Sequence, residues 1–248
     1  MENKKGLDQT LVLIKPDALK NSLTGYVLSQ LSEFHSGLRF AGTRVVSVSR
    51  MLAEEHYAEH RGKVFYPSLI EYIMGRIHYP DEPHKQRVIA IVYQGPDAVA
   101  TVREIAGPTN PHDARHQRPG CIRSLGTVVP LTDAQGNRIG ERMDNLIHAS
   151  ATRAEAEHEI KLWFKPADIP PFMRTFAVRH NVEEHFYYKD DQLFTQHEPG
   201  SICVLAPGDV MWESDAQALE LISQGEKAPC SLHTVVAKYL TNETPESR

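Results

Sequence analysis

Short apolar runs alternate with amphipathic stretches along the first two thirds of the chain. Residues 10–15 form a continuous apolar run ending on a lysine, which predicts a buried strand, and residues 87–93 predict a second one. Residues 38–50 have a β-like composition between them. In residues 22–36 the apolar side chains fall on one helical face, and Gly37 is a typical C-cap.

Three more helices are expected before residue 107. They cover residues 53–60, 68–74 and 97–106, and Gly107 closes the last one. The order along the chain is then β-α-β-α-α-β-α. Short helices among few strands favour a small sheet that helices cover on one face.

The polar segment 107–120 is expected to be a loop, and long loops inside compact domains are usually functional or disordered. Residues 121–130 return to strand character, and the turn residues at 132–137 predict a β-hairpin. A strand that leads to His148 and a helix over 153–164 complete the unit.

Beyond residue 164 the pattern changes, because prolines interrupt it at Pro166, Pro170 and Pro171. We expect a smaller extension of mixed α and β structure over residues 165–248. Its elements are a hairpin within 185–194, a strand at 202–205, and helices over 214–223 and 231–240.

Composition and charge limit the classes of function. The chain has 41% hydrophobic and 24% charged residues and a net charge of −5, so no global basic surface suggests nucleic-acid binding. An anionic substrate would need a locally basic site. The 3 scattered cysteines argue against a disulfide framework and for a reducing compartment. No apolar run approaches the about 20 residues that span a bilayer, and no signal peptide is seen. A cytoplasmic protein without membrane contact is expected.

The segment 145–161 carries the main candidate for chemistry. His148 ends an apolar step, directly before small residues and a helix start. Thr152 and Glu155 form a capping box, and Glu159 lies two turns into the helix, from where it can reach back. A histidine near a carboxylate and a helix N-terminus suits nucleophilic attack on an anionic group such as phosphate. The alternative is a structural histidine in a strand-to-helix turn.

Other candidates have equally simple alternatives. Lys15 stands at a strand end, where binding groups and ordinary solvated lysines both occur. Tyr57 and Phe65 are either core residues or, for Phe65, a platform that stacks on a base.

Arginines bracket the polar loop, and their guanidinium groups suit phosphate oxygens, although scattered surface arginines are the alternative. The set is Arg103, Arg118 and Arg123, together with Thr109. A Walker-type P-loop is absent, so nucleotide chemistry would need another device. The histidine pairs 56/60 and 112/116 lack the cysteine or carboxylate partners of a zinc pattern, and no protein-held metal is expected.

Taken in order, these residues resemble the nucleoside diphosphate kinase family over residues 10–164. The matching signatures are Ile14-Lys-Pro-Asp17; His56-Tyr57 followed by Phe65; Arg103 with Gly107-x-Thr-Asn-Pro111; Pro119-Gly-x-Ile-Arg123; Asn145-x-x-His-x-Ser150; and Glu159 followed by Ile-x-Leu-Trp-Phe164. Each motif alone is weak, and their ordered coincidence carries the resemblance.

The resemblance implies an α+β fold, ferredoxin-like βαββαβ, with a four-stranded antiparallel sheet covered by helices. It implies a kinase-like domain over residues 1–164, which leaves 165–248 as an extension of unknown role. Homo-oligomers are usual in the family, and a homo-oligomer is expected here.

The resemblance also implies ping-pong transfer of the γ-phosphate from ATP or another nucleoside triphosphate to a nucleoside diphosphate through a phosphohistidine. His148 would be the nucleophile, Glu159 would orient it, and Ser150 would hydrogen-bond nearby. The nucleotide-binding residues would be Lys15 and Asn145 on the ribose, Phe65 on the base, and Tyr57, Arg103, Thr109 and Arg123 on the phosphates. Mg²⁺ would be held mainly by those phosphates. Stacking without contacts to the base edge predicts broad base tolerance.

The sequence departs from the family pattern in several places. Ala149 adds a methyl group beside the nucleophile, and Ala151 removes a carboxylate near the metal. Residues 76–87 and about 126–140 look inserted. The alternative function is a non-catalytic nucleotide-binding regulatory protein on the same scaffold. Retention of His148, Glu159 and the arginines argues against it, because such charges are costly to cluster without an anionic ligand.

Overall fold

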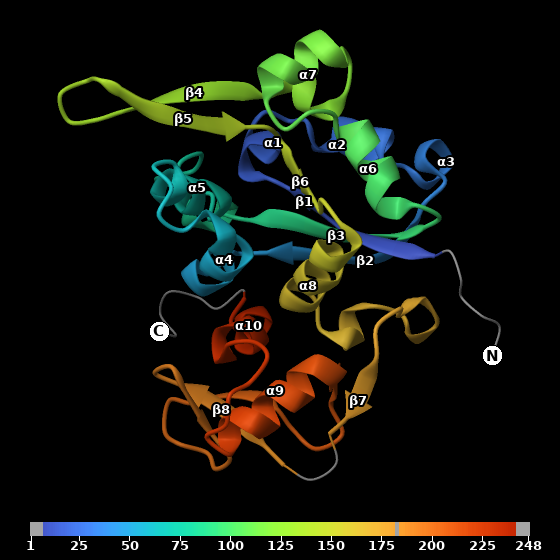
Figure 1. Cartoon of the computed structure of the whole chain (residues 1–248), viewed down its shortest axis with the longest axis vertical. Coiled ribbons are helices and arrows are strands. Elements are labelled where there is room, and N and C mark those ends of the chain that lie inside the picture. Colours follow the sequence, from blue (N-terminus) through green and yellow to red (C-terminus); the bar gives the residue numbers. More distant parts are fainter. Residues whose placement is uncertain (1–6, 182–183, 242–248) are drawn as a thin grey trace.

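A four-stranded antiparallel sheet lies at the centre of the computed structural model, which describes residues 7–181 and 184–241 (Figure 1). Its strands are β1 (Asp8–Ile14), β2 (Arg39–Val46), β3 (Val88–Gly95) and β6 (Ile147–Ala149), in the order β2-β3-β1-β6. Every neighbouring pair is antiparallel. This order is consistent with the expected ferredoxin-like fold.

Helices cover both faces of this sheet, so the expectation of one covered face is wrong. Alternation along β1 sends Leu11 and Leu13 into one buried cluster and Val12 and Ile14 into another. The first cluster also takes in α4 (Arg50–His56), α5 (Tyr66–Ile73) and α8 (Arg153–Trp163). The second takes in α1 (Pro16–Lys20), α2 (Thr24–Gln30) and α6 (Ala98–Ala106). A continuous apolar run is what a strand buried on both faces requires.

Three segments differ from the expected elements. The helix expected over 22–36 is split, because Ser32 caps a separate short helix, α3 (Glu33–Ser36). The polar segment after Gly107 contains α7 (Pro111–Gln117), which begins where the Asn110 side chain accepts a hydrogen bond from the amide of His112 at 2.8 Å. Residues 122–125 form a 3-10 helix, and the strand β4 (Thr127–Thr132) starts only after Gly126.

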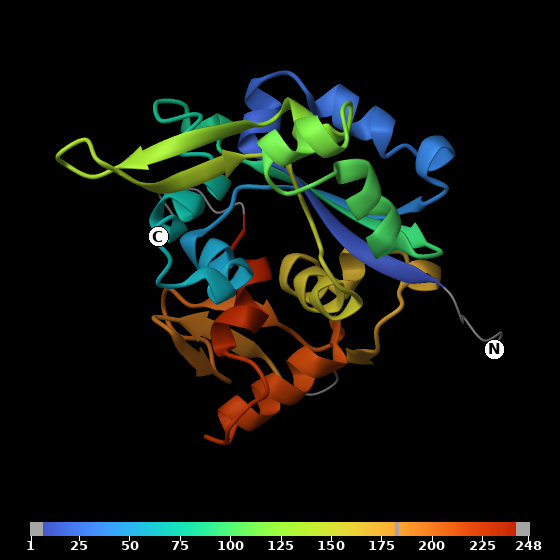
Figure 2. The ribbon, with the colours of Figure 1, turned by 45° about the horizontal axis from the view of Figure 1, so that its top comes forward.

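The predicted hairpin is present. β4 pairs with β5 (Arg138–Asp144) as a separate two-stranded sheet, and Asp133 accepts the amides of Gln135 and Asn137 in the turn. The hairpin projects from the body of the molecule in both views (Figures 1 and 2). Its base leads directly into β6, which carries His148.

The C-terminal segment is small and mixed in secondary structure. It contains a sheet of order β10-β8-β9, a two-stranded sheet β11-β7, and the helices α9 (Glu213–Ser223) and α10 (Leu232–Val236). The strands are β7 (Val178–His180), β8 (Phe186–Lys189), β9 (Gln192–Phe194), β10 (Ile202–Leu205) and β11 (Val210–Trp212).

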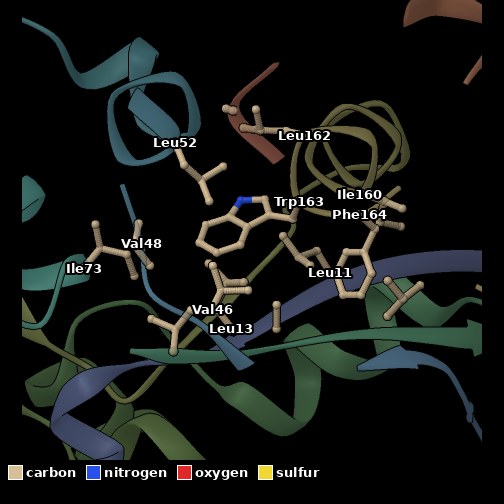
Figure 3. Close-up of a cluster of buried hydrophobic side chains, with 14 of the residues drawn as sticks. Leu11, Leu13, Val46, Val48, Leu52, Ile73, Ile160, Leu162, Trp163 and Phe164 are labelled. Atoms are coloured by element: carbon tan, nitrogen blue, oxygen red, sulfur yellow. The ribbon is translucent and has the colours of Figure 1, made fainter. Parts of the chain in front are cut away.

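This C-terminal segment shares a core with the sheet. Trp212 and Ala237 belong to the same buried cluster as Leu11 and Trp163. The indole of Trp212 is fully buried and donates a hydrogen bond to the carbonyl of Phe164 at 2.7 Å. Figure 3 shows how the apolar side chains of this cluster surround Trp163 between β1, α4 and α8.

Two further findings concern membrane-spanning helices and the cysteines. Across residues 7–181 and 184–241, no helix has the length and apolar character needed to cross a membrane. The cysteines at 121, 203 and 230 are all free thiols.

Candidate active site

One cavity of about 310 Å³ opens beside β6 and collects nearly all of the site residues predicted from the sequence. Its lining includes Lys15, Tyr57, Phe65, Arg103, Thr109, Arg123, Asn145, His148 and Glu159. Ser150 lies behind the lining and is fully buried. Arg118 is not part of the lining and pairs with Glu104 on the surface.

His148 is held between a strand and a helix. It lies opposite Leu13 in the β1–β6 pairing, and its Nε2 is 2.8 Å from Oε1 of Glu159 on α8. That nitrogen makes no well-aligned hydrogen bond to another described residue. The Ser150 hydroxyl donates to the other oxygen of Glu159 at 2.6 Å. Ser150 is fixed in turn, because its Oγ accepts the amide of Leu11 at 3.1 Å.

Glu159 is held in its charged form. Burial alone would raise its pKa, but the electrostatic interaction with the adjacent His148 ring, together with the hydrogen bond from Ser150, outweighs burial and lowers the pKa to about 2. The carboxylate is therefore an anion at neutral pH and stabilises a positive imidazole ring beside it.

The capping box of α8 forms only in part. The Thr152 hydroxyl accepts the amide of Glu155 at 3.1 Å, as expected. The Glu155 carboxylate accepts a hydrogen bond from the amide of Ala151 at 3.2 Å instead of one from the amide of Thr152. Glu155 thereby lines the cavity next to the residue where the family pattern has an acidic side chain.

A strained backbone turn precedes His148. Leu146 has a φ of +70°, and the amide of Ile147 donates to the carbonyl of Asn145 at 2.8 Å across it. This is the geometry of a γ-turn with positive φ, which is rare and strained. The Asp17 carboxylate accepts the Leu146 amide at 2.9 Å, and the Lys15 amide donates to the Leu146 carbonyl at 2.9 Å. The Lys-Pro-Asp motif thus fixes the backbone that carries His148.

His56 is a site residue to which the sequence analysis assigned no role. Its ring is completely buried and lies edge-on to His148, with ring centroids 4.5 Å apart. Its Nδ1 accepts a hydrogen bond from the Trp163 indole at 3.2 Å and lies 3.9 Å from Glu159. Burial, with the neighbouring His148, lowers its pKa to about 3, so the ring is neutral near pH 7. The only signal in the sequence was its place in the His-Tyr motif.

Lys15 and Asn145 meet at the deep end of the cavity. The Lys15 ammonium donates to the Asn145 side-chain oxygen, and the Asn145 amide donates to the carbonyl of Thr109 at 2.7 Å. Lys15 is buried, and this lowers its pKa to about 8 in spite of the nearby Asp17 carboxylate. The lysine at this strand end is therefore buried and is not a solvated boundary residue.

Arg123 is a buried cation at the same end. It donates to the carbonyl of Gly107 at 3.0 Å, and its Nε has no hydrogen-bond partner among the described residues. Burial and the neighbouring Arg103 lower its pKa to about 10, still well above neutral pH. Gly107 has a φ of +82° and no room for a side chain, since a Cβ would lie 2.2 Å from the Cys121 sulfur. A buried guanidinium with an unused donor is a site for an anion.

Aromatic rings form another part of the cavity wall. Tyr57 stacks on His60, and His60 meets the ring of Phe65 edge-on at 5.5 Å between centroids. Burial raises the pKa of Tyr57, so its hydroxyl keeps its proton and can donate a hydrogen bond. Phe65 is only partly buried, which agrees with a platform for a planar ligand better than with a core residue.

The hairpin also contributes to the cavity wall, through Glu141, Arg142 and Met143 of β5. These residues directly follow the segment of about 126–140 that looks inserted ahead of the histidine. Arg142 is tied to Asp144 at 2.7 and 3.1 Å, and Asp144 also pairs with His78 at 3.0 Å. The segment 76–87 is therefore joined through His78 to Asp144 at the end of β5, the strand that follows the second segment that looks inserted.

Three side chains at the site could act as ligands of a metal ion. Among the described residues, His56, His148 and Glu159 form a group whose ligand atoms lie within 4.8 Å of one another. Two imidazoles and one carboxylate suit zinc or iron rather than magnesium, which prefers oxygen. The His56/His60 pair has no carboxylate partner in the sequence pattern, whereas in the structure Glu159 lies near His56.

Comparisons with known proteins agree on one family. The family model described as nucleoside diphosphate kinase matches residues 8–169. The nucleoside diphosphate kinase of Pyrococcus furiosus is 39% identical over 163 residues, 66% of this chain and 86% of the relative. That of Pyrococcus abyssi is 36% identical over 188 residues, 76% of this chain and 98% of the relative.

Solved structures give the same result. The nucleoside diphosphate kinase of Halobacterium salinarum in complex with CDP has a TM-score of 0.51 and 31% identity, and the match covers 68% of this chain and 94% of that one. A nucleoside-diphosphate kinase from Borrelia burgdorferi, a transition state mimic with vanadate and ADP, has a TM-score of 0.51 and 28% identity over 68% and 94% of the two chains. The chain is therefore a phosphotransferase and belongs to the nucleoside diphosphate kinase family.

Proposed function

We propose that the protein transfers the γ-phosphate of a nucleoside triphosphate to a nucleoside diphosphate in a ping-pong cycle through a phosphohistidine at His148. The observation that carries this proposal is the Glu159 carboxylate 2.8 Å from Nε2 of His148, within a cavity that also holds buried cations. The site belongs to a chain of the right family.

The nucleophile in this proposal is Nδ1 of His148. With Glu159 ionised beside it, Nε2 keeps its proton, so the lone pair is on Nδ1. Nδ1 attacks the γ-phosphorus, a nitrogen–phosphorus bond forms, and the bond to the β,γ-bridging oxygen breaks with its electrons on the leaving diphosphate. The imidazole becomes positively charged, and Glu159 stabilises it. A terminal β-phosphate oxygen of the second nucleotide then reverses the step.

The phosphate groups are assigned to the cations and donors on the cavity wall. Arg103, Arg123, Tyr57 and Thr109 would bind phosphate oxygens as charge spreads over the transferring group. The buried guanidinium of Arg123, which keeps its charge at neutral pH, supports this role. Because these groups are already held by the fold, little reorganisation accompanies the reaction.

The nucleoside is assigned to two groups of residues in the cavity wall. Lys15 and Asn145, already joined by a hydrogen bond, would hold the ribose hydroxyls at the deep end. Phe65, which is only partly buried, would stack on the base. A lysine with a pKa of about 8 is still mostly charged at neutral pH.

Mg²⁺ would be held mainly by the phosphates, since the cavity offers no cluster of oxygen ligands among the described residues. Its role when bound is to neutralise phosphate charge. Glu155, on the cavity wall beside Ala151, would be a carboxylate near the bound metal.

Three further expectations belong to this proposal. We also propose a homo-oligomer, because the resemblance implies one, and a cytoplasmic location, because the cysteine content favours a reducing compartment. A non-catalytic regulatory role is not favoured, because the relatives are named as enzymes and every residue that the mechanism needs is present.

Intact mass tests the proposal. After mixing with ATP and magnesium, we expect a gain of one phosphoryl group that is stable to base, labile to acid and discharged by GDP. His148→Ala should show no gain while still binding ADP by calorimetry. His158→Ala is the matched control, because His158 is exposed on the same helix. Phosphotransfer by His148→Ala equal to that of the unchanged protein would refute the assignment.

A further inference from the structure

We propose that the C-terminal segment supports the active site, and that Thr234 on α10 is a positioning residue for the phosphotransfer. Through Glu55, Thr234 holds the end of α4, which leads to His56 and Tyr57. This inference rests on the proposed function, because it assumes that His148 is the phosphorylated residue. It gives a role to a part of the chain that lies beyond the residues matched by the family model.

The helix α10 lies against α4 (Figure 1). Met51 and Glu55 are four positions apart on α4, so their side chains lie on the same side of this helix. Met51 packs against a buried cluster that contains Val236 of α10. Glu55 is nearly buried, with 15% of its side chain exposed. The C-terminal segment thus covers one side of the helix that ends at His56.

The Glu55 carboxylate joins α10 to the loop that follows α4. Its Oε2 accepts a hydrogen bond from the Thr234 hydroxyl at 2.7 Å and a longer one from the Ser231 hydroxyl at 3.4 Å. Its Oε1 lies 3.4 Å from the guanidinium group of Arg61 in that loop. A hydrogen bond to a carboxylate is stronger than one between neutral groups. The short contact with Thr234 therefore fixes the last turn of α4.

Trp163 connects the C-terminal segment to His56 by a second route. The Trp163 indole donates a hydrogen bond to Nδ1 of His56 at 3.2 Å, and the two rings meet edge-on with centroids 5.4 Å apart. The same indole belongs to the buried cluster that includes Trp212 and Ala237. His56 is therefore held on its backbone side through Glu55 and on its ring side through Trp163.

The position of His56 matters because its ring packs directly against the nucleophile. The buried His56 ring lies edge-on to His148, with centroids 4.5 Å apart. If the end of α4 moves, this contact opens and the His148 ring can turn away from the phosphorus atom. Tyr57, which follows His56 and lines the cavity, moves with it. A displacement of about 1 Å at a reacting group can lower a rate about 100-fold.

The effect should fall on the chemical step rather than on nucleotide binding. The residues assigned to the ribose and the base, Lys15, Asn145 and Phe65, lie outside α4. Loss of the Thr234 hydroxyl should therefore lower kcat and leave the affinity for ADP nearly unchanged. A merely structural role would instead lower the free energy of unfolding and leave kcat of the folded protein as it was.

The test compares Thr234→Val, which keeps the shape of the side chain without its hydroxyl, with Thr234→Ser, which keeps the hydroxyl. The phosphoryl gain at saturating ATP and magnesium is followed by intact mass, and ADP binding by calorimetry. We expect the rate to be about 10-fold lower in Thr234→Val and close to normal in Thr234→Ser. Thr195→Val is the matched control, because it removes an exposed threonine hydroxyl from the same segment. It should leave the rate unchanged.

Hydrogen exchange at the tryptophan indoles measures the same link without chemistry. The chain has 2 tryptophans, and both indoles are fully buried donors. Trp163 donates to His56, whereas Trp212 donates to the carbonyl of Phe164, which is not part of α4. Thr234→Val should speed exchange at Trp163 and leave exchange at Trp212 nearly unchanged.

An unchanged phosphorylation rate in Thr234→Val would overturn the proposal. Equal losses in Thr234→Val and Thr234→Ser would do the same, because the hydroxyl would then not be the cause. If urea unfolding shows that Thr234→Val does not fold, Glu55→Gln replaces the charged acceptor of the same hydrogen bond, and an unchanged rate in that variant would also refute the link. No phosphoryl gain in the unchanged protein would refute the phosphotransfer itself. Faster exchange at Trp163 in Thr234→Val would still support the link in that case, and unchanged exchange would overturn it.

Discussion

The carboxylate of Asp17 accepts a hydrogen bond from the backbone amide of Leu146 at 2.9 Å, although 129 positions separate the two residues. Leu146 is the residue at positive φ two positions before His148. A carboxylate on α1 therefore holds the strained turn that leads to His148. Asp17 belongs to the Lys-Pro-Asp motif, so this motif positions the backbone directly before His148.

Replacement of Asp17 tests this link. Asp17→Ala leaves the buried Leu146 amide without its acceptor, which should cost about 1–3 kcal/mol in the free energy of unfolding. Phosphoryl gain at His148 should slow as well, because the turn is no longer fixed. Urea unfolding and the rate of phosphorylation measure the two effects. Asp81→Ala, at an exposed position, should change neither; equal behaviour of both variants would contradict the role of Asp17.

Acid should destabilise the protein through Glu159. Its pKa in the folded state is lowered from 4.5 to about 2, so its contribution is complete above the unfolded pKa and is lost as the pH falls through about 2. The loss should be on the order of 3 kcal/mol. Unfolding measured between pH 5 and 2 should be less pH-dependent in Glu159→Gln than in the unchanged protein. Parallel curves would show that another carboxylate governs this range.

Nucleotide use should decline in alkali because of Lys15. Burial lowers its pKa to about 8, so the ammonium loses its proton above this pH and binds ribose oxygens less strongly. We expect kcat/KM to fall about 10-fold per pH unit above pH 8. Lys15→Arg keeps its charge throughout, so its lower activity should not show this fall. If the fall persists in Lys15→Arg, a different group titrates.

Trp212 should stabilise the whole chain rather than its C-terminal part alone. It is fully buried in the cluster that contains Leu11 and Trp163. Trp212→Ala should cost about 3–5 kcal/mol and should lower the midpoint of a single unfolding transition followed at the sheet and at the C-terminal segment. Phe172→Ala, which removes a largely exposed ring, is the control. Two separate transitions would show instead that residues 165–248 fold on their own.

Much of the site could be predicted because its chemistry follows a fixed order along the chain. His148, Glu159, Lys15 and Arg123 were recognisable from their motifs, and the structure brings them to one cavity. The roles of these residues still depend on the proposed experiments.

Three features of the structure were not predicted from the sequence, and each omission has a physical cause. The helix α7 has only Pro111 and Ala114 buried, so no apolar periodicity marked it, and its signal was the Asn110 cap followed by proline. His56 was compared with His60 along a helix, whereas its actual neighbours His148 and Glu159 come from distant segments. The contribution of Glu141 to the cavity wall depends on the direction in which a hairpin leaves the body, which strand periodicity does not specify.

The core that holds Trp163 includes residues from Leu11 to Ala237, close to the two ends of the described chain. During synthesis the N-terminal part of a protein emerges first and folds as soon as it can bury its core, at about 5–20 residues per second. Here the sheet and every residue of the cavity emerge while the surface that Trp212 and Ala237 cover is still open to water. The nascent active-site half must therefore wait for nearly the last residues before its apolar surface is closed, and during that interval it is the part most exposed to chaperones and to aggregation.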